Sequence, residues 1–327
     1  MREENTKDEA GINKVQEFSE TIISNVEKVI VGKRSSIERV LIALMCRGHV
    51  LIEDVPGTGK TMLARAVAIS TGLKYKRLQC TPDLLPNDVT GVSVFNQKSR
   101  EFEFRPGPIF SSILLVDEIN RATPRTQSAL LEAMGEGQIS ADGLTYPLSD
   151  PFMVLATQNP IEFEGTFPLP EAQMDRFLLR LHIGYPNSAD EDAMMQMQQL
   201  NHPIEKLKQV IDGKHILEIQ QMVRQVHVVE NIRLYILNLV QATREHPALA
   251  LGASPRGSLA LFRTAQARAA LQGRDYVIPD DVKWVAVACL AHRMMLNPEN
   301  ILSGLTTTDV VQELSLIHIS EPTRLQV

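Results

Sequence analysis

The sequence predicts an α/β protein in which a parallel sheet flanked by helices is followed by a smaller, all-helical domain. Short apolar runs alternate with helical stretches through the first half of the chain, as is typical of strands buried on both faces of a parallel sheet. Beyond Tyr185-Pro186 the composition shifts and helical periodicity dominates. A glycine-rich turn joins the first apolar run to the next helix, which is the usual element order of a parallel α/β unit.

The overall composition is that of an ordinary globular protein. Of the 327 residues, 44% are hydrophobic and 22% are charged, so the chain can bury a sizeable core. The formal net charge of -6 gives no global indication of a nucleic-acid or anionic-membrane partner. The opening MREENTKDEAGINK lacks the apolar segment of a secretory signal, and no apolar run approaches the length of a membrane span. We therefore expect a cytoplasmic protein.

Apolar residues recur at helical spacing near the start of the chain, at Val15, Phe18, Ile22 and Val26. This pattern predicts a helix over 15–29, and a second amphipathic helix follows over 35–47. Residues 1–14 are polar, and we expect them to form a flexible extension.

The predicted strands of the sheet are short and apolar, and helices over 61–71 and 127–135 lie between them. The strands span 49–53, 75–80, 112–118, 152–158 and 177–183. Two hairpins interrupt this alternation, at 93–104 and at 138–148, and the second turns at Asp142-Gly143. The α/β domain is therefore predicted over 15–184.

Helical periodicity predicts the second domain over 185–313. Its helices are expected at 190–200, 215–223, 230–244, 255–272 and 279–293. Residues 314–327 break this periodicity. We expect them to form an irregular tail, and whether that tail is native is open.

The glycine-rich turn, EDVPGTGKT, is similar to a phosphate-binding loop whose first glycine is missing. The usual pattern is G-x-x-x-x-G-K-[ST]; here Asp54 stands in the first place and Gly59-Lys60-Thr61 is intact. Pro56 fixes its own φ, so the chain from Asp54 to Pro56 can still turn. The alternative is a glycine-rich turn with no ligand. The apolar strand before it and the helix after it favour the phosphate loop.

This loop predicts a site for a nucleotide and its metal. Backbone N–H groups, turned inward at Gly57 and Gly59, would surround the phosphates. The helix that starts near Thr61 would point its positive end at them. Lys60 would reach the terminal phosphates, and the Thr61 hydroxyl would take one Mg²⁺ site.

An acidic pair follows the third predicted strand, in ILLVDEINRA. Asp117 can hold Mg²⁺ through water, and Glu118 can polarise a water for attack on the γ-phosphate. The alternative is a helix N-terminal cap. A phosphate loop in the same sheet favours the functional interpretation, because ligands of open α/β sheets bind at the carboxyl ends of the strands.

Three further polar residues are candidates for the same reaction. Asn159, in ATQNP, ends the neighbouring strand and could orient the water or sense the γ-phosphate, or it is a turn residue before Pro160. Arg176, in LPEAQMDRF, could reach the γ-phosphate of a neighbouring subunit, or it is a surface or capping arginine. Arg256 lies in the first turn of a helix, where the dipole disfavours a cation. That position suggests a compensating anion; the alternative is a solvated side chain.

Together these motifs resemble the AAA+ ATPases, and specifically the MoxR family. EDVPGTGKT, RPGPIF, ILLVDEINRA, ATQNP and LPEAQMDRF match that family in wording and order, over about 15–293. Its loops often read E-D-x-P-G, so the missing glycine is compatible with the family. Departures concentrate after about Glu313.

The resemblance implies a role for each candidate residue and a lid role for the helical domain, with ATP and Mg²⁺ as ligands. Lys60 and Thr61 match the Walker A pair, Asp117 and Glu118 the Walker B pair, and Asn159 the first sensor; Arg176 matches the arginine finger, Arg256 the second sensor, and Val31-Gly32 the adenine-pocket segment. The implied catalytic residues are Glu118, Asn159, Arg176 and Arg256. The implied cofactor-binding residues are Val31, Gly32, Pro56, Gly57, Thr58, Gly59, Lys60, Thr61 and Met62, and the metal ligands are Thr61 and Asp117.

The resemblance also implies a homo-oligomeric ring, usually of six subunits, that remodels a client protein. A partner with a von Willebrand factor A (VWA) domain and a part in metal-cofactor insertion belong to the same expectation. One alternative is a nucleic-acid motor or loader, which would need basic and aromatic hairpin tips. The first hairpin has Lys98 and Arg100 but also Glu101 and Glu103, and SADGLTY has no basic residue. Another alternative is a nucleotide-gated switch with slow turnover.

Overall fold

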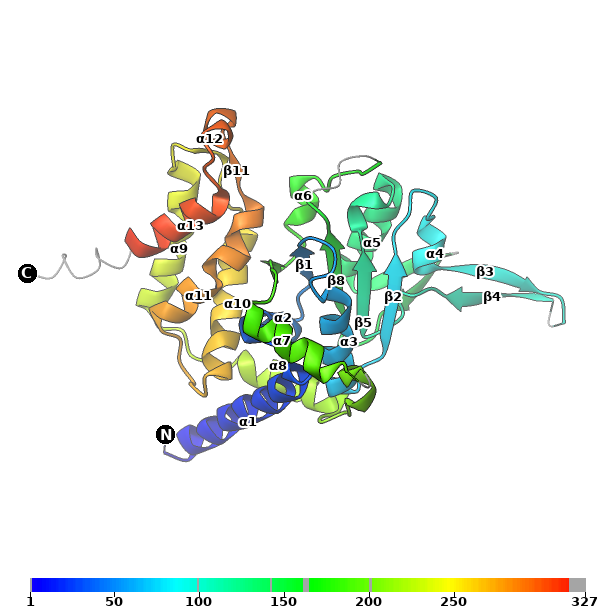
Figure 1. The fold of residues 1–327 in the computed structure, drawn as a ribbon, viewed down its shortest axis with the longest axis horizontal. Coiled ribbons are helices and arrows are strands. Elements are labelled where there is room, and N and C mark those ends of the chain that lie inside the picture. Colours follow the sequence, from blue (N-terminus) through cyan, green and yellow to red (C-terminus); the bar gives the residue numbers. More distant parts are fainter. Residues whose placement is uncertain (1, 99, 142, 161–164, 200–201, 318–327) are drawn as a thin grey trace, which may run out of the picture.

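The computed structural model describes residues 2–98, 100–141, 143–160, 165–199 and 202–317. A five-stranded sheet, in the order β2-β5-β8-β1-β9, lies beside a group of helices from the second half of the chain (Figure 1). Every neighbouring pair in this sheet is parallel. The predicted α/β architecture with a helical second part is therefore confirmed.

The first part of the chain contains the sheet, two hairpins and the helices around them. The sheet strands are β1 (Val50–Glu53), β2 (Tyr75–Gln79), β5 (Ile113–Asp117), β8 (Met153–Gln158) and β9 (Leu179–Leu181). The hairpin strands are β3 (Gly91–Asn96), β4 (Glu101–Pro106), β6 (Gln138–Ala141) and β7 (Leu144–Pro147). The helices are α1 (Arg2–Glu27), α2 (Arg34–Met45), α3 (Lys60–Thr71), α4 (Pro86–Thr90), η1 (Ile119–Arg121), α5 (Pro124–Glu136) and α6 (Glu171–Met174).

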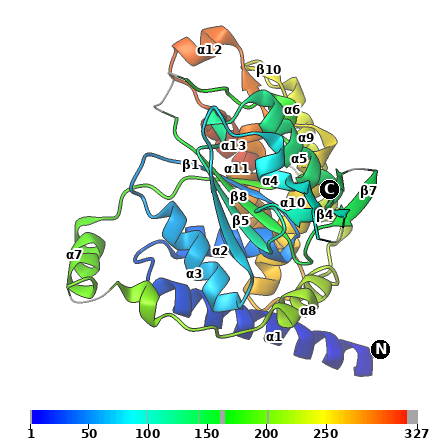
Figure 2. The ribbon, with the colours of Figure 1, turned by 90° about the vertical axis from the view of Figure 1, so that its right-hand side faces the viewer.

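The second part is mostly helical. Its helices are α7 (Ser188–Met197), η2 (Pro203–Lys206), α8 (Gly213–Val223), α9 (Glu230–Glu245), α10 (Pro255–Leu271), α11 (Pro279–Leu290), η3 (Ala291–Arg293), α12 (Pro298–Leu302) and α13 (Thr307–Ile317). Figure 2 shows α7 standing out from the body of the molecule, and none of its residues is buried.

Three features differ from the sequence-based expectations. Residues 2–14, for which we expected a flexible extension, form the first half of α1, which includes the buried Ile12. Residues 314–317 are not irregular, because α13 runs to Ile317; the rest of the expected tail, 318–327, lies outside the described residues. The helical part also contains a short antiparallel pair, β10 (Leu249–Leu251) with β11 (Met295–Leu296), too short to give a sequence signal.

The sheet is buried on both faces, as its continuous apolar strands predict. Along β1, Val50 and Ile52 pack in one hydrophobic cluster with α1, α2 and α3, whereas Leu51 packs in a second cluster with α5. Successive side chains point to opposite faces of a strand, so every residue of such a strand must be apolar. Polar side chains of the sheet are therefore expected at the carboxyl ends of its strands.

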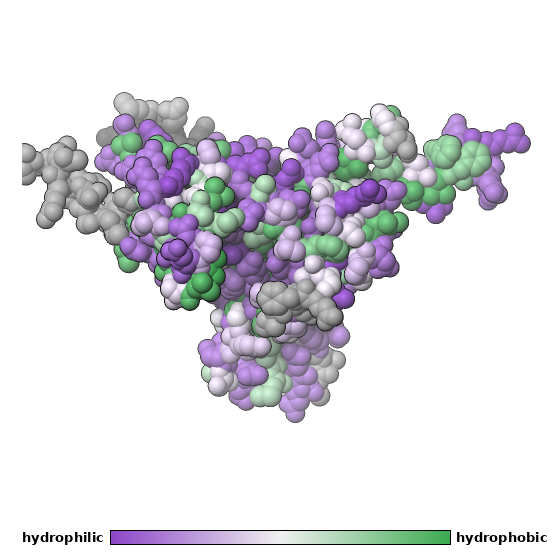
Figure 3. Space-filling view, turned by 90° about the horizontal axis from the view of Figure 1, so that it is seen from above, coloured by the Kyte–Doolittle hydropathy of each residue, from purple (hydrophilic) through white to green (hydrophobic). Residues whose placement is uncertain are grey.

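Both predicted hairpins are present. The pair β3–β4 forms an arm that projects from the body, and apolar side chains gather on it (Figure 3). Phe104 of β4 stacks on Tyr146 of β7, with ring centroids 4.2 Å apart and planes inclined by 16°. The base of the arm is therefore fixed to the second hairpin. In the turn of that hairpin Gly143 has φ +75°, whereas Asp142 lies outside the described residues.

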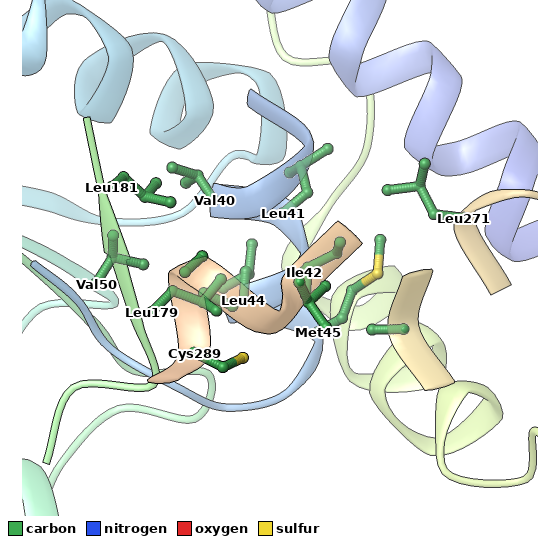
Figure 4. Close-up of a cluster of buried hydrophobic side chains, with 14 of the residues drawn as sticks. Val40, Leu41, Ile42, Leu44, Met45, Val50, Leu179, Leu181, Leu271 and Cys289 are labelled. Atoms are coloured by element: carbon green, nitrogen blue, oxygen red, sulfur yellow. The ribbon is translucent and has the colours of Figure 1, made fainter. Parts of the chain in front are cut away.

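Helix α2 joins the sheet to the helical part. Val40 and Leu44 of α2 lie in one hydrophobic cluster with Leu179 of β9 and Cys289 of α11 (Figure 4). Burial raises the pKa of Cys289 to about 11, so the thiol stays neutral inside this cluster. Because one cluster continues from the sheet into α10 and α11, these helices are packed firmly against the α/β part.

Candidate functional site

The glycine-rich loop connects the carboxyl end of β1 to the first turn of α3. Gly57 has φ +86° and Gly59 φ +84°, a conformation that other residues rarely adopt. A Cβ on Gly57 would meet no described atom within 4 Å, so the constraint there is the backbone angle and not the space. A loop of this shape at a helix N-terminus presents backbone N–H groups to an anion.

Asp54, in place of the usual first glycine, accepts backbone hydrogen bonds through both oxygens of its carboxylate. Its Oδ2 accepts hydrogen bonds from the backbone N–H of Ile183 at 2.8 Å and of Gly184 at 2.6 Å, and its Oδ1 accepts from Val55 N–H at 2.9 Å. Lys60 Nζ donates to the carbonyl oxygen of Asp54 at 2.6 Å. The hydrogen bonds to Ile183 and Gly184 could not be predicted from the sequence, because they depend on where the chain returns after β9.

The two acidic candidates end β5, next to β8 in the sheet. Asp117 is buried; its Oδ1 accepts from Thr157 Oγ1 at 3.1 Å and its Oδ2 from Arg77 Nε at 2.7 Å. Thr157 also accepts from the backbone N–H of Glu118 at 2.9 Å. Sequence reasoning missed Thr157 and Arg77, which belong to different strands and come together only through the strand order.

Glu118 has φ +56°, in the left-handed region. A non-glycine residue held there costs on the order of 1–3 kcal/mol, and such residues cluster at functional sites. Its side chain pairs with Arg121, with Nη1 and Oε2 3.0 Å apart. Glu118 stands before η1 without a side-chain capping hydrogen bond. The geometry therefore does not support the alternative of a simple helix cap.

Cys80 lies beside this acidic pair, with its backbone N–H donating to the carbonyl oxygen of Asp117 at 2.9 Å. Burial, and then the negative charges of Asp117 and Glu118, raise the pKa of Cys80 to about 12. The Cys80 side chain is therefore a neutral thiol, poorly suited to act as a nucleophile or metal ligand.

Asn159 directly follows β8, and its side chain is buried. Because β8 lies between β5 and β1, Asn159 sits at the sheet edge between the acidic pair and the glycine-rich loop. The structure thus brings the loop, Asp117, Glu118 and Asn159 to the carboxyl edge of one sheet.

The adenine-pocket candidates Val31 and Gly32 lie between α1 and α2. Gly32 has φ +71°, and a Cβ there would collide with the carboxylate of Asp190 in the first turn of α7. Lys33 Nζ donates to the carbonyl oxygen of Tyr185 at 2.8 Å. The chain that follows β9 therefore passes over this segment as well as over Asp54.

The two candidate arginines lie together, in a different place. Arg176 Nη1 donates to the backbone carbonyl of Leu131 in α5. Arg256 is largely exposed, and its Nη1 lies 3.9 Å from the carboxylate of Asp175. Both arginines line one hollow of about 380 Å³, and none of its lining residues comes from the glycine-rich loop or the acidic pair. Arg293 Nε lies 2.7 Å from the carboxylate of Asp175, which also accepts a hydrogen bond. These two partners hold Asp175 in the wall of the hollow.

Within the described residues, no helix combines the length and apolarity that a membrane crossing requires.

Comparison with known proteins gives two family matches. Residues 49–179 match the ATPase family associated with various cellular activities (AAA), and residues 241–314 match the AAA lid domain.

Similar proteins cover almost the whole chain. Uncharacterized protein YeaC of Bacillus subtilis is 53% identical over 292 residues, which cover 89% of this chain and 91% of that protein. Chaperone MoxR1 of Mycobacterium tuberculosis is 40% identical, with 89% of this chain and 79% of that protein covered. The solved structure of an ATPase candidate from Cytophaga hutchinsonii is 39% identical, with a TM-score of 0.89, and the match covers 95% of this chain and 97% of that one. The chain belongs to the MoxR family of AAA+ ATPases.

Proposed function

We propose that the chain binds ATP with Mg²⁺ at the carboxyl edge of the sheet and hydrolyses it to remodel client proteins. One arrangement supports this above all: the glycine-rich loop, the acidic pair and Asn159 meet at one sheet edge. Asp117 and Thr61 offer the oxygen ligands that Mg²⁺ prefers, and a bound Mg²⁺ would offset the charge of the phosphates. In this proposal the backbone of 57–62 and Lys60 hold the phosphates, and Pro56, Thr58 and Met62 complete the wall.

Glu118 acts as general base in this proposal. Its carboxylate takes a proton from the attacking water, while Asn159 orients that water. In the described structure Arg121 holds the same carboxylate. We propose that Arg121 releases Glu118 when substrate is bound, so that the base becomes available only in a loaded site.

We propose that Arg176 and Arg256 act in trans, on ATP bound by the next subunit of a ring. They line a hollow separate from their own glycine-rich loop, and a head-to-tail contact that closes would place this hollow against a neighbour. An arginine finger supplied by a neighbour stabilises the transferring charge. A hexamer is our expected ring size, to be measured by native mass spectrometry with a non-hydrolysable ATP analogue.

Mixed rings test this trans action. We expect Arg176→Ala subunits and Glu118→Gln subunits to be inactive alone and partly active when mixed. In an equal mixture about one junction in four pairs an intact Glu118 with an intact neighbouring Arg176, so about a quarter of the wild-type ATPase rate should return. A mixture of Arg256→Ala and Glu118→Gln subunits tests in the same way whether Arg256 acts in trans.

Subunits carrying both Arg176→Ala and Glu118→Gln are the control for this rescue. Mixed with wild-type subunits, they show how one defective subunit affects its neighbours. If mixed single mutants stay inactive although rings form, Arg176 does not act across the junction.

The arm formed by β3 and β4 is the surface we propose for contact with a client protein. Phe95 and Phe102 pack edge to face, with centroids 5.3 Å apart, and Phe102 is 74% exposed. A hollow of about 590 Å³ lies between this arm and the second hairpin, and Leu144 and Tyr146 contribute to its wall. Exposed apolar side chains over such a hollow suit the apolar side chains of an unfolded chain.

Phe102→Ser tests the arm. We expect casein, a chain that stays unfolded, to stimulate the ATPase of the wild type and to bind the variant about tenfold more weakly, since a buried Phe side chain stabilises by roughly 1.5–3 kcal/mol. The basal ATPase rate should not change, because the arm projects from the body of the molecule, away from the sheet (Figure 1). Leu302→Ser, at the exposed end of α12, is the matched control. Equal stimulation of wild type and Phe102→Ser would remove the arm from the proposal.

The nucleic-acid alternative makes a different prediction for the same arm. Residues 91–106 contain three basic and two acidic side chains, Lys98, Arg100 and Arg105 against Glu101 and Glu103. Nearly balanced charge favours an apolar contact over a phosphate backbone. Stimulation of the ATPase by single-stranded DNA that falls steeply with salt would reverse this preference.

Two further expectations follow from family membership. A relative is a chaperone by name, which supports a client protein, and we extend the proposal to a VWA-domain partner and to metal-cofactor insertion. We propose domains at 15–184 and 185–313 with a boundary near Tyr185-Pro186. Because α10 and α11 share a hydrophobic cluster with α2, we place the nucleotide-driven motion in the segment from 182 through α7.

A further inference from the structure

We propose that Asp54 is a positioning residue that ties the glycine-rich loop to residues 182–185 and so couples occupancy of the loop to the position of α7. The proposal rests on nucleotide binding by the loop. We call residues 182–185 the linker, because they lead from β9 to α7.

The Asp54 carboxylate accepts hydrogen bonds from backbone N–H groups. It is 9% exposed and accepts from Ile183 and Gly184 of the linker through one oxygen and from Val55 of the loop through the other. Hydrogen bonds to an ionised acceptor are stronger than those between neutral groups. One side chain therefore joins two segments that are far apart in the sequence.

A glycine in place of Asp54 could form the same turn but could not bind the linker. The N–H groups of Ile183 and Gly184 would lose the carboxylate that they now share, and a buried donor without an acceptor is costly. Gly184 itself has φ +68°, so the linker turns sharply at the point where Asp54 holds it. The departure from the usual motif thus has a structural consequence at a second place in the chain.

The linker is also fixed at its two ends. His182 Nδ1 lies 2.7 Å from the carbonyl oxygen of Glu53, at the end of β1. Lys33 Nζ donates to the carbonyl oxygen of Tyr185 at 2.8 Å, next to the adenine-pocket segment. The linker therefore contacts both ends of the proposed nucleotide site. The helix that follows it, α7, has no buried residue, and the carboxylate of its Asp190 lies against Gly32 of the adenine-pocket segment.

Asp54 also faces the group that nucleotide would displace. Lys60 Nζ donates to the Asp54 carbonyl oxygen at 2.6 Å, whereas in the proposed function the ammonium group of Lys60 binds a phosphate. When Lys60 turns to the phosphate, the peptide group after Asp54 loses this donor and can rotate. The carboxylate of the same residue carries that rotation to Ile183 and Gly184.

Asp54→Gly is an unusually clean test, because it removes the tie and restores the usual loop motif. We expect the variant to bind a non-hydrolysable ATP analogue with an affinity within about threefold of wild type, while kcat falls about tenfold and KM stays within about threefold. Hydrogen–deuterium exchange of a peptide covering 181–187 should respond to the analogue in wild type. In the variant this response should be lost, and exchange without nucleotide should be faster.

Two companion variants complete the experiment. Asp54→Asn keeps the shape but can offer an acceptor to only one of its two sets of donors, so it should lose part of the response even if Asp54→Gly folds poorly. Asp212→Gly is the matched control, because Asp212 also accepts from two backbone N–H groups, those of Lys214 and His215, but at the start of α8. It should keep the response of the linker.

The outcomes separate the tie from the proposed function. If Asp54→Gly had the same exchange response and the same kcat as the wild type, the proposed coupling would be wrong. So would a loss of nucleotide binding in that variant alone, because Asp54 would then serve the loop itself. Failure of the wild-type chain to bind the analogue would instead remove the proposed function.

Discussion

Lys60→Ala is expected to weaken MgATP binding by at least about 100-fold, to below the detection limit of titration calorimetry. Lys60 starts α3, at the end of a loop whose glycines have the positive φ of a phosphate cradle. Its ammonium group supplies charge-assisted hydrogen bonds to phosphate, and about 3 kcal/mol of lost binding corresponds to this change in affinity. The fold should remain, because the side chain is only partly buried.

Lys76→Ala is the matched control, because Lys76 is an exposed lysine on β2 with no part in the loop. It should bind MgATP as the wild type does. Tight binding by Lys60→Ala would show that the loop does not hold phosphates through this side chain. No heat from the wild-type chain with either MgATP or a non-hydrolysable analogue would remove the nucleotide site altogether.

Glu118→Gln is expected to lower kcat by about 100- to 1,000-fold and to leave nucleotide affinity unchanged, as the loss of a general base does. Gln keeps the size of the side chain and an oxygen that can still face Arg121. The change therefore removes basicity while it leaves the contacts of this left-handed residue in place. Single-turnover hydrolysis and calorimetry on the same material separate the chemical step from binding.

Glu132→Gln, at an exposed position of α5, is the control for this substitution. Unchanged turnover in Glu118→Gln would contradict the assignment of Glu118 as base. If the wild type itself hydrolyses ATP at a negligible rate while it binds tightly, the chain is a nucleotide-gated switch with slow turnover.

The sheet and the positions of its polar ends could be predicted because their signals are local. A strand buried on both faces needs an unbroken apolar run such as ILLV before Asp117, and a glycine-rich turn needs its glycines at fixed places. The helical second part was predictable for the same reason, since helical spacing repeats within a few residues. The roles of Glu118, Asn159, Arg176 and Arg256 stay predictions until the variants above are measured.

Other features could not be predicted from the sequence, because they carry no local signal. Residues 2–14 belong to α1, although their polar composition carries little apolar periodicity. The strands β10 and β11 pair although Leu249 and Met295, one in each strand, are distant in the chain. Arg77 reaches Asp117 only because β2 lies next to β5 in the sheet.

By itself, the sequence determined the five strands of the sheet, the two hairpins and the longer helices, and that a phosphate-type loop and an acidic pair end two of those strands, because such preferences act between near neighbours. Tertiary structure alone decided that Asp54 binds the linker, that Arg77 pairs with Asp117, and that Arg176 and Arg256 share a hollow apart from the loop. These contacts depend on strand order and on the return path of the chain, which many distant residues fix together through burial of a common core.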